Sequence, residues 1–345
     1  MASKVLAKVY RGDVVESVHR GRYVIIDGEG REVAAEGSPK TVTFIRSAAK
    51  PFQVLPCLTS GAADAAGFSE EEIALACASH SGEARHVRIA QLMLERIGLS
   101  EIHLRCGTHL PFYDKEAERM QRASEFPTQL HNNCSGKHAA MLALAKHVGA
   151  DITSYDAAEN PVQKEILNAV AAITEVPAAK IKTAIDGCAA PNFALPLSAM
   201  ARGFMNLINP PEHFSRELKS ACERVVSAMV KNPELIGGTE RLDTLLMQAA
   251  EGRIISKVGA EGVWLCSVLP SEKYPSGLAI ALKVEDGDDR RARPVASAAI
   301  LKRLGVVSED TLPDLSPMPI KNRRGDTVGS IQPSGVLLKE LEKSH

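Results

Sequence analysis

Residues 131–138 form the densest group of side chains that could do chemistry, reading His-Asn-Asn-Cys-Ser-Gly-Lys-His just before an apolar, helix-like stretch. A helix start needs one capping residue, such as Asn or Ser, so the thiol, the amine and the imidazoles exceed what capping requires. A helix N-terminus also presents unpaired N–H groups and a partial positive charge, which suit a carboxylate or an oxyanion. A second cluster at 186–192 reads Asp-Gly-Cys-Ala-Ala-Pro-Asn. The two clusters together favour small-molecule chemistry over a polar loop that merely leads into a buried helix.

Ser47 and Lys50 stand three residues apart, between a predicted strand and a predicted helix. At a helix start this spacing places both side chains on the same side. A lysine that is desolvated, or crowded by another cation, has a lowered pKa and can take a proton from a serine. Because this spacing also arises by chance, the alternative of a capping serine and a solvated lysine stays open.

A second hydroxyl–amine combination involves Ser79 and Ser81, in a predicted loop between helices, and Lys257, on a predicted strand. These residues resemble the remaining motifs of the penicillin-recognising serine enzymes, which carry Lys-Thr-Gly on that strand. Here Val258 replaces the threonine and removes a hydroxyl that β-lactam recognition uses, which argues against β-lactam chemistry. For Lys257 the plain alternative is a charge at the edge of a strand.

Cys134, Lys137 and Cys188 offer two thiolates and an amine, which could hold Zn²⁺ and leave a fourth position for water. Lysine is a poor ligand because it must first lose a proton. The alternative is a pair of small buried cysteines, the most common fate of a free thiol. Asp186, beside Cys188, could orient water, bind an ammonium group or cap a turn before Gly187.

Composition excludes several classes of protein. The 345 residues are 45% hydrophobic and 24% charged with a net charge of −1, values of an ordinary globular enzyme with no preference for nucleic acid or a membrane surface. Only 4% of the residues are aromatic, which is too few for base-stacking platforms. The seven cysteines have no Cys-x-x-Cys spacing, which favours a reducing compartment, and with no signal-like N-terminus we expect a cytoplasmic protein. No nucleotide-loop or zincin motif is present.

The order of the elements predicts an α+β fold. Strands are expected at 5–10, 14–19, 23–27, 42–45, 253–258, 262–269 and 277–284. Helices are expected at 51–58, 69–78, 86–97, 137–147, 161–174, 193–204, 215–231, 241–250 and 290–304, with a surface loop at 312–320. Strands that follow one another through short turns imply an antiparallel sheet from both termini, with an inserted helical region. We therefore expect a single catalytic domain with a sheet part at about 1–48 and 250–310 and a helical part at about 49–249.

Taken together, the motifs at 46–53, 78–83, 131–138 and 186–191 resemble the class 3, rhizobial-type L-asparaginases of the asparaginase II family, in order and spacing from about residue 9 to 299. The resemblance implies a fold similar to serine β-lactamases and penicillin-binding proteins, a homodimer, and hydrolysis of L-asparagine to L-aspartate and ammonia. It implies a Ser-Lys pair at Ser47 and Lys50, and another at Ser79 and Lys257. It also implies a site, usually for zinc, at Cys134, Lys137 and Cys188, with Asp186 near the water or the substrate.

The chemistry of amide hydrolysis fits these residues, since it needs a nucleophile, a base and preorganised donors for an oxyanion. Arg46 is a candidate for the substrate α-carboxylate and Asp186 for its α-ammonium group. The motifs also make Ser81, Asn133 and His138 candidates for substrate binding. Two alternatives remain: a related Ser-Lys amidase acting on glutamine or a short peptide, and a catalytically silent amino-acid sensor.

Overall fold

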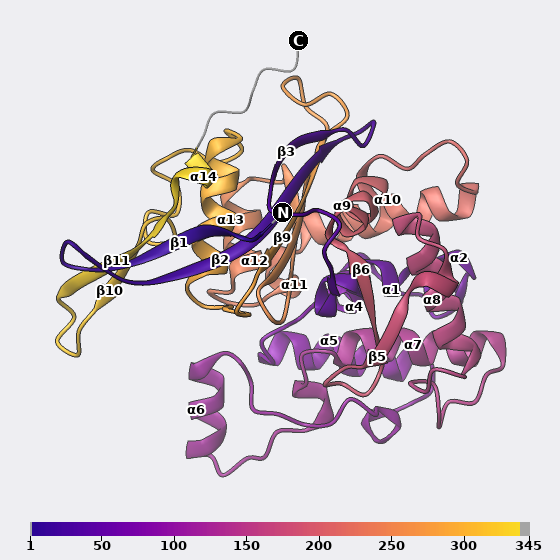
Figure 1. Ribbon diagram of the computed structural model, residues 1–345. Coiled ribbons are helices and arrows are strands. Elements are labelled where there is room, and N and C mark those ends of the chain that lie inside the picture. The colour runs from indigo at the N-terminus through magenta and orange to yellow at the C-terminus, as the bar shows by residue number, and fades with distance from the viewer. Residues whose placement is uncertain (1, 339–345) are drawn as a thin grey trace. The chain divides into compact units, whose positions relative to one another are not determined.

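The computed structural model describes residues 2–338, which form two compact units (Figure 1). Among the described residues, the sheet unit comprises residues 2–48, Leu195–Met205 and residues 245–338. The helical unit comprises Ala49–Ala194 and Asn206–Thr244. Leu195–Met205, which the sequence analysis assigns to the helical part, belongs to the sheet unit.

An antiparallel sheet is the centre of the sheet unit. Within the described residues its strands run in the order β10-β11-β1-β2-β9-β8-β7, with β3 paired to β2. The strands are β1 Lys4–Arg11, β2 Val14–Asp27, β3 Glu32–Glu36, β7 Ile254–Gly259, β8 Val263–Val268, β9 Leu278–Val284, β10 Met318–Lys321 and β11 Thr327–Pro333. Because β1 pairs with both β2 and β11, and β2 pairs with β9, one sheet contains strands from both ends of the chain. The predicted α+β class with an antiparallel sheet is confirmed.

The helix α13 Ala292–Arg303 contributes to the core of the sheet unit. Its small residues allow close packing, and the helix is buried from Ala292 to Leu301. One cluster of buried side chains joins the helix to the strands, and it consists of Ala7, Val9, Val284, Ala292, Val295 and Ile331. Every residue of β7 and β8 is buried as well, including the polar Ser256 and the charged Lys257 of β7.

Several predicted elements differ from the structure. The strands expected at 14–19 and 23–27 are one continuous strand, β2. The glycine at position 21 is not a turn but a residue of this strand that pairs with β9. A Cβ at this position would lie 2.4 Å from the Lys283 carbonyl oxygen, so the absence of a side chain allows the two strands to come this close. The helix expected at 193–204 starts as the strand β6 Pro191–Pro196 before α9 Leu197–Ile208 begins, because a short apolar run does not distinguish strand from helix. The loop expected at 312–320 ends in β10, which pairs with β11.

The helical unit gathers most of the helices. They are α1 Lys50–Gln53, α2 Leu55–Thr59, α3 Ala62–Ala65, α4 Glu70–Cys77, α5 Ala84–Arg96, α6 Asp114–Arg122, α7 Ser135–Val148, α8 Pro161–Thr174, α10 Arg216–Lys231 and α11 Pro233–Ile236. A strand β5 Lys182–Ile185 pairs antiparallel with β6. The remaining short elements of the chain are β4 Val42–Phe44, η1 Arg46–Ala49, η2 Glu101–His103, η3 Gln129–His131, η4 Ala178–Lys180, α12 Leu242–Ala249 and α14 Gly335–Leu338. Among the described residues, no helix has the length and apolar character needed to cross a bilayer.

The helix α7 is the central element of the helical unit and packs against α4, α5 and α8. It is buried continuously from Ser135 to Ala145. Four alanines and Gly136 keep this stretch narrow, so neighbouring helices can pack closely against it. The first turn of α7 carries the reactive residues of the 131–138 segment, and the packing of α7 therefore sets their positions.

Replacing Gly136 with alanine is expected to destabilise the protein by about 2–3 kcal/mol, although alanine favours a helix interior by about 1 kcal/mol. A Cβ at this position would lie 2.4 Å from the Leu75 carbonyl oxygen of α4. The matched control is Gly335→Ala at the start of α14, where a Cβ would meet nothing within 4 Å. Urea unfolding followed by circular dichroism measures both variants. Equal stability of the two would contradict this account of the α4–α7 contact.

Candidate active site

The predicted site residues divide between the two units. Arg46, Ser47 and Lys257 belong to the sheet unit. The others belong to the helical unit, and they are Lys50, Ser79, Ser81, Asn133, Cys134, Lys137, His138, Asp186 and Cys188.

Lys50, the first residue of α1, is almost completely buried, with 1% of its surface exposed. Its Nζ donates to the Ala78 carbonyl oxygen at 2.5 Å, to the Ser79 hydroxyl at 3.0 Å and to the Asn133 carbonyl oxygen at 3.0 Å. These contacts account for the three protons of an ammonium group. The structure thus joins Lys50 to Ser79, a contact that the sequence analysis did not predict because it depends on tertiary packing.

The loop that carries Ser79 is fixed by His80, which is fully buried. The His80 Nδ1 accepts from the Gly82 N–H at 3.2 Å, so Nε2 carries the proton and donates to the Ser135 hydroxyl at 2.9 Å. That hydroxyl donates to the Leu130 carbonyl oxygen at 3.0 Å. Burial, and then the neighbouring His86, lower the pKa of His80 far below its usual value, so the ring stays neutral. The network ties the Ser79 loop to the first turn of α7.

Glu83 anchors the other end of the same loop. Its carboxylate accepts hydrogen bonds from the Ser81 hydroxyl at 2.6 Å, from the Arg85 guanidinium at 2.8 Å and from the backbone and hydroxyl of Thr239, both at 2.8 Å. Ser81, a predicted substrate contact, is fully buried and its hydroxyl is engaged by Glu83. Burial acts to raise the pKa of Glu83, but the hydrogen bonds from Ser81 and Thr239 outweigh it and hold that pKa below its usual value.

Replacing Glu83 with glutamine is therefore expected to lower the free energy of unfolding at pH 7 by about 1–2 kcal/mol, because a half-buried acceptor of several hydrogen bonds loses its charge. The depressed pKa means that the stabilisation is complete above the ordinary glutamate pKa and disappears as the pH falls through the folded value. Urea unfolding of both proteins at pH 7 and at pH 3 should show this difference shrinking in acid. The control is Glu95→Gln on the exposed face of α5, for which we expect no difference at either pH. A Glu83→Gln deficit that stays constant with pH would contradict the role of the charge.

The side chains of Cys134, Lys137 and Cys188 lie together, as the metal prediction requires. The Lys137 Nζ donates to the Cys188 sulfur at 2.9 Å, and all three side chains are buried. A hydrogen bond from Cys134, followed by the charge of Lys137, lowers the pKa of Cys188 despite burial, whereas the same hydrogen bond and burial raise the pKa of Cys134. Burial opposes a charge on Lys137, but the Cys188 thiolate prevails and raises the pKa of Lys137. These shifts favour a thiolate at Cys188 beside the Lys137 ammonium, with the Cys134 thiol next to them.

These donors fit a zinc ion, since two sulfurs and an amine nitrogen meet in a buried place. His138 lies beside the cluster: it is fully buried, and a hydrogen bond between its ring and the Cys188 sulfur helps to lower the pKa of Cys188. Its Nδ1 contacts the Tyr155 hydroxyl at 2.7 Å. Within residues 2–338, this cluster included, no group of three or more His, Cys, Asp or Glu side chains is arranged to hold a metal, so a zinc ion here would depend on Lys137 as a ligand.

Asp186 follows β5 and lies close to this cluster, since its charge contributes to the raised pKa of Lys137. Its Oδ1 accepts from the Gly187 N–H at 2.9 Å, and its backbone N–H donates to the Ala190 carbonyl oxygen at 2.9 Å. The carboxylate is half-buried. Its place beside the cluster suits either a water molecule or a substrate ammonium group.

In the sheet unit, the segment before Ser47 runs beside the end of β7. A Cβ at Gly259 would lie 2.6 Å from the Ile45 carbonyl oxygen, so only glycine allows this approach. Arg46 has a positive φ of 56° and lies 3.9 Å from the Glu261 carboxylate. Lys257, on β7, is fully buried, and its Nζ contacts the Val258 carbonyl oxygen at 3.0 Å. A strained backbone and a buried lysine on neighbouring segments are features of functional sites.

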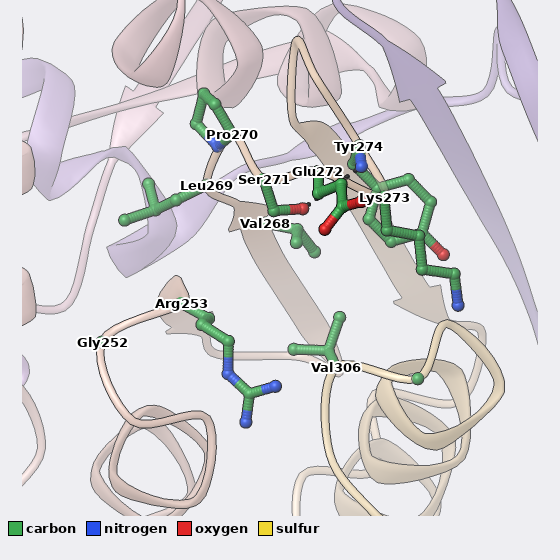
Figure 2. A pocket seen from close by; sticks show the side chains of 11 residues that line it. Gly252, Arg253, Val268, Leu269, Pro270, Ser271, Glu272, Lys273, Tyr274 and Val306 are labelled. Atoms are coloured by element: carbon green, nitrogen blue, oxygen red, sulfur yellow. Dashed lines mark hydrogen bonds between the residues drawn. The ribbon is translucent and has the colours of Figure 1, made fainter.

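A separate pocket of the sheet unit, of about 690 Å³, lies between the start of β7 and the connection from β8 to β9 (Figure 2). Its floor includes Val268 and Val306, and Arg253 reaches into it. None of the predicted site residues lines this pocket.

A buried lysine that is hydrogen-bonded to a serine hydroxyl can serve as the base in acyl transfer. The chain belongs to the L-asparaginase II family, whose sequence model matches residues 7–333. Membership of this family supports an amidohydrolase.

Solved structures give two further similarities. The chain is similar to a probable glutaminase from Bacillus subtilis complexed with 6-diazo-5-oxo-L-norleucine, at 11% identity and a TM-score of 0.41, over 84% of this chain and 85% of that chain. It is also similar to Mglu in its glutamate form, at 17% identity and a TM-score of 0.37, over 84% of this chain and 62% of that chain. No curated protein matches the chain.

Proposed function

We propose that the protein is an L-asparaginase, which hydrolyses the side-chain amide of L-asparagine to L-aspartate and ammonia. The observation that carries the proposal is the buried Lys50, whose nitrogen contacts the Ser79 hydroxyl at 3.0 Å in a chain of the L-asparaginase II family. Family membership supports an amide substrate, and asparagine is the substrate that the sequence resemblance implies.

In the proposed mechanism, neutral Lys50 takes the proton of the nucleophilic serine, which we assign to Ser47, and the serine oxygen bonds to the amide carbon. The tetrahedral oxyanion then collapses: the carbon–nitrogen bond breaks, and protonated Lys50 supplies the proton that releases ammonia. Ser79, hydrogen-bonded to Lys50, is placed to relay that proton. Water attacks the ester, gives its proton to Lys50, and the serine recovers a proton as aspartate leaves.

The remaining residues hold the substrate. Arg46 would bind the α-carboxylate and Asp186 the α-ammonium group, and the Lys257 amine would complete the second Ser-Lys pair with Ser79. Cys134, Lys137 and Cys188 would hold a zinc ion, which would supply Lewis-acid chemistry when bound. Lys137 would have to lose its proton before it could act as a ligand. The resemblance also implies that the protein forms a homodimer and that its fold is similar to that of the serine β-lactamases, and we include both in the proposal.

Ammonia release from L-asparagine by the purified protein tests the proposal directly, with L-glutamine and short peptides as competing substrates. Parallel assays with chelator and with added zinc show whether the metal matters for turnover. Preference for glutamine or a peptide would favour the related amidase. Binding of amino acids without ammonia release would favour the silent sensor and overturn the proposed activity.

A further inference from the structure

We propose that His109 is a positioning residue, which sets the direction of the Lys50 amine through the backbone of Asn133. This inference rests on the proposed function, since it concerns the base of that reaction. His109 lies in an irregular segment with no motif around it, so the sequence alone does not single it out. It is the contacts of its two ring nitrogens that single it out.

The protonation of the His109 ring follows from its neighbours. Its Nδ1 lies 2.7 Å from the Leu110 carbonyl oxygen, which can only accept, so Nδ1 carries the proton. Nε2 is therefore the acceptor, and the Asn133 N–H donates to it at 3.0 Å. His109 thus fixes the backbone of the residue whose carbonyl oxygen accepts from Lys50 at 3.0 Å.

The geometry of an amine explains why that carbonyl matters. A neutral lysine has two N–H bonds and one lone pair, and only the lone pair can take a proton. In the neutral form that the proposed mechanism requires, the two N–H groups of Lys50 stay on the carbonyl oxygens of Ala78 and Asn133, and the lone pair faces the third contact, the Ser79 hydroxyl, through which the Ser47 proton would be relayed to it. If the Asn133 backbone moves, one N–H loses its acceptor and the lone pair is no longer directed.

The His109 ring is held by stacking rather than by deep burial. It stacks on Phe112 with ring centroids 4.5 Å apart and planes 13° from parallel, and the Arg241 guanidinium lies 5.3 Å from the centre of the Phe112 ring. The segment is also joined to the Ser79 loop, because the Tyr113 N–H donates to the Ser81 carbonyl oxygen at 3.2 Å. These contacts orient Nε2 toward the Asn133 N–H.

Two substitutions separate the hydrogen bond from the packing. His109→Phe keeps a flat ring for stacking on Phe112 but removes the acceptor, whereas His109→Gln restores an acceptor without a ring. We expect His109→Phe to lower kcat for asparagine about tenfold with KM changed less than about twofold, and His109→Gln to recover most of kcat. His103→Phe, at a half-buried histidine of η2, is the control and should behave as the wild type.

Hydrogen exchange at the Asn133 amide provides a readout that does not depend on turnover. We expect exchange about fivefold to tenfold faster in His109→Phe than in the wild type or His109→Gln. Unchanged exchange in His109→Phe, wild-type kcat in that variant, or equal loss in both variants would each overturn the inference. If the wild type releases no ammonia but the Asn133 amide exchanges as expected in the wild type and both His109 variants, the proposed function is wrong. The hydrogen bond by which His109 orients the Asn133 backbone would still be supported.

Discussion

Replacing Lys50 with methionine is expected to lower kcat/KM for L-asparagine by about 10³-fold or more, while the protein stays folded. Methionine keeps a long apolar stem in a place where 1% of the lysine surface is exposed, but it cannot accept a proton. Ammonia release measures the effect. The control is Lys146→Met at the exposed end of α7, which should leave kcat/KM unchanged.

The two candidate serines give this prediction a second part. Ser47→Ala should remove most activity, and the double variant with Lys50→Met should be little worse than either single one, because the two residues act as one unit. Peptide mapping after acid quenching during turnover should find the acyl group on Ser47. An acyl group on Ser79, the serine that contacts Lys50, would reverse the two assignments, and near-wild-type turnover by Ser47→Ala would do the same.

The purified protein is expected to contain about one zinc ion per chain, and Cys188→Ala should lose it. Cys188 supplies one sulfur of the cluster, and the Lys137 Nζ donates to this sulfur at 2.9 Å. The substitution therefore removes one expected zinc ligand and also the hydrogen-bond acceptor of Lys137. Metal analysis by mass spectrometry measures the ratio. In a bound site, we expect Zn–S distances near 2.3 Å and Zn–N distances near about 2.0–2.1 Å.

Cys222→Ala in α10 is the matched control, since this cysteine is also completely buried but lies outside the cluster. Its zinc content should equal that of the wild type. Undiminished zinc in Cys188→Ala would remove Cys188 from the set of ligands. Loss of zinc in both variants would point to general unfolding rather than to a ligand.

The sequence predicts elements best where local chemistry is explicit. Ser69 caps α4 in a box with Glu72, and α8 spans the predicted 161–174, because caps and helical periodicity are encoded within a few residues. It fails at β6, where an apolar run of three residues fits either period, and at β10, which is a strand only because β11 lies beside it.

The same distinction holds for the site. The spacing at 134–137 brings Cys134 and Lys137 into the first turn of one helix, and the structure adds Cys188 to them. The roles of His80, Glu83 and His109 could not be predicted in the same way. Each acts through backbone groups or side chains far away in the sequence, and those contacts exist only after the helices have packed.

The place of β1 between β2 and β11 has a consequence for the order of events during synthesis. The first strands leave the ribosome long before β9 and β11, with the whole helical unit translated between them. Pairing of such distant segments gives a high contact order, which slows folding. Until residues 327–333 emerge, β1 has an open edge that can pair with another nascent chain. The helices can therefore become compact while the chain is still growing, whereas the sheet is completed only after residues 327–333 have emerged.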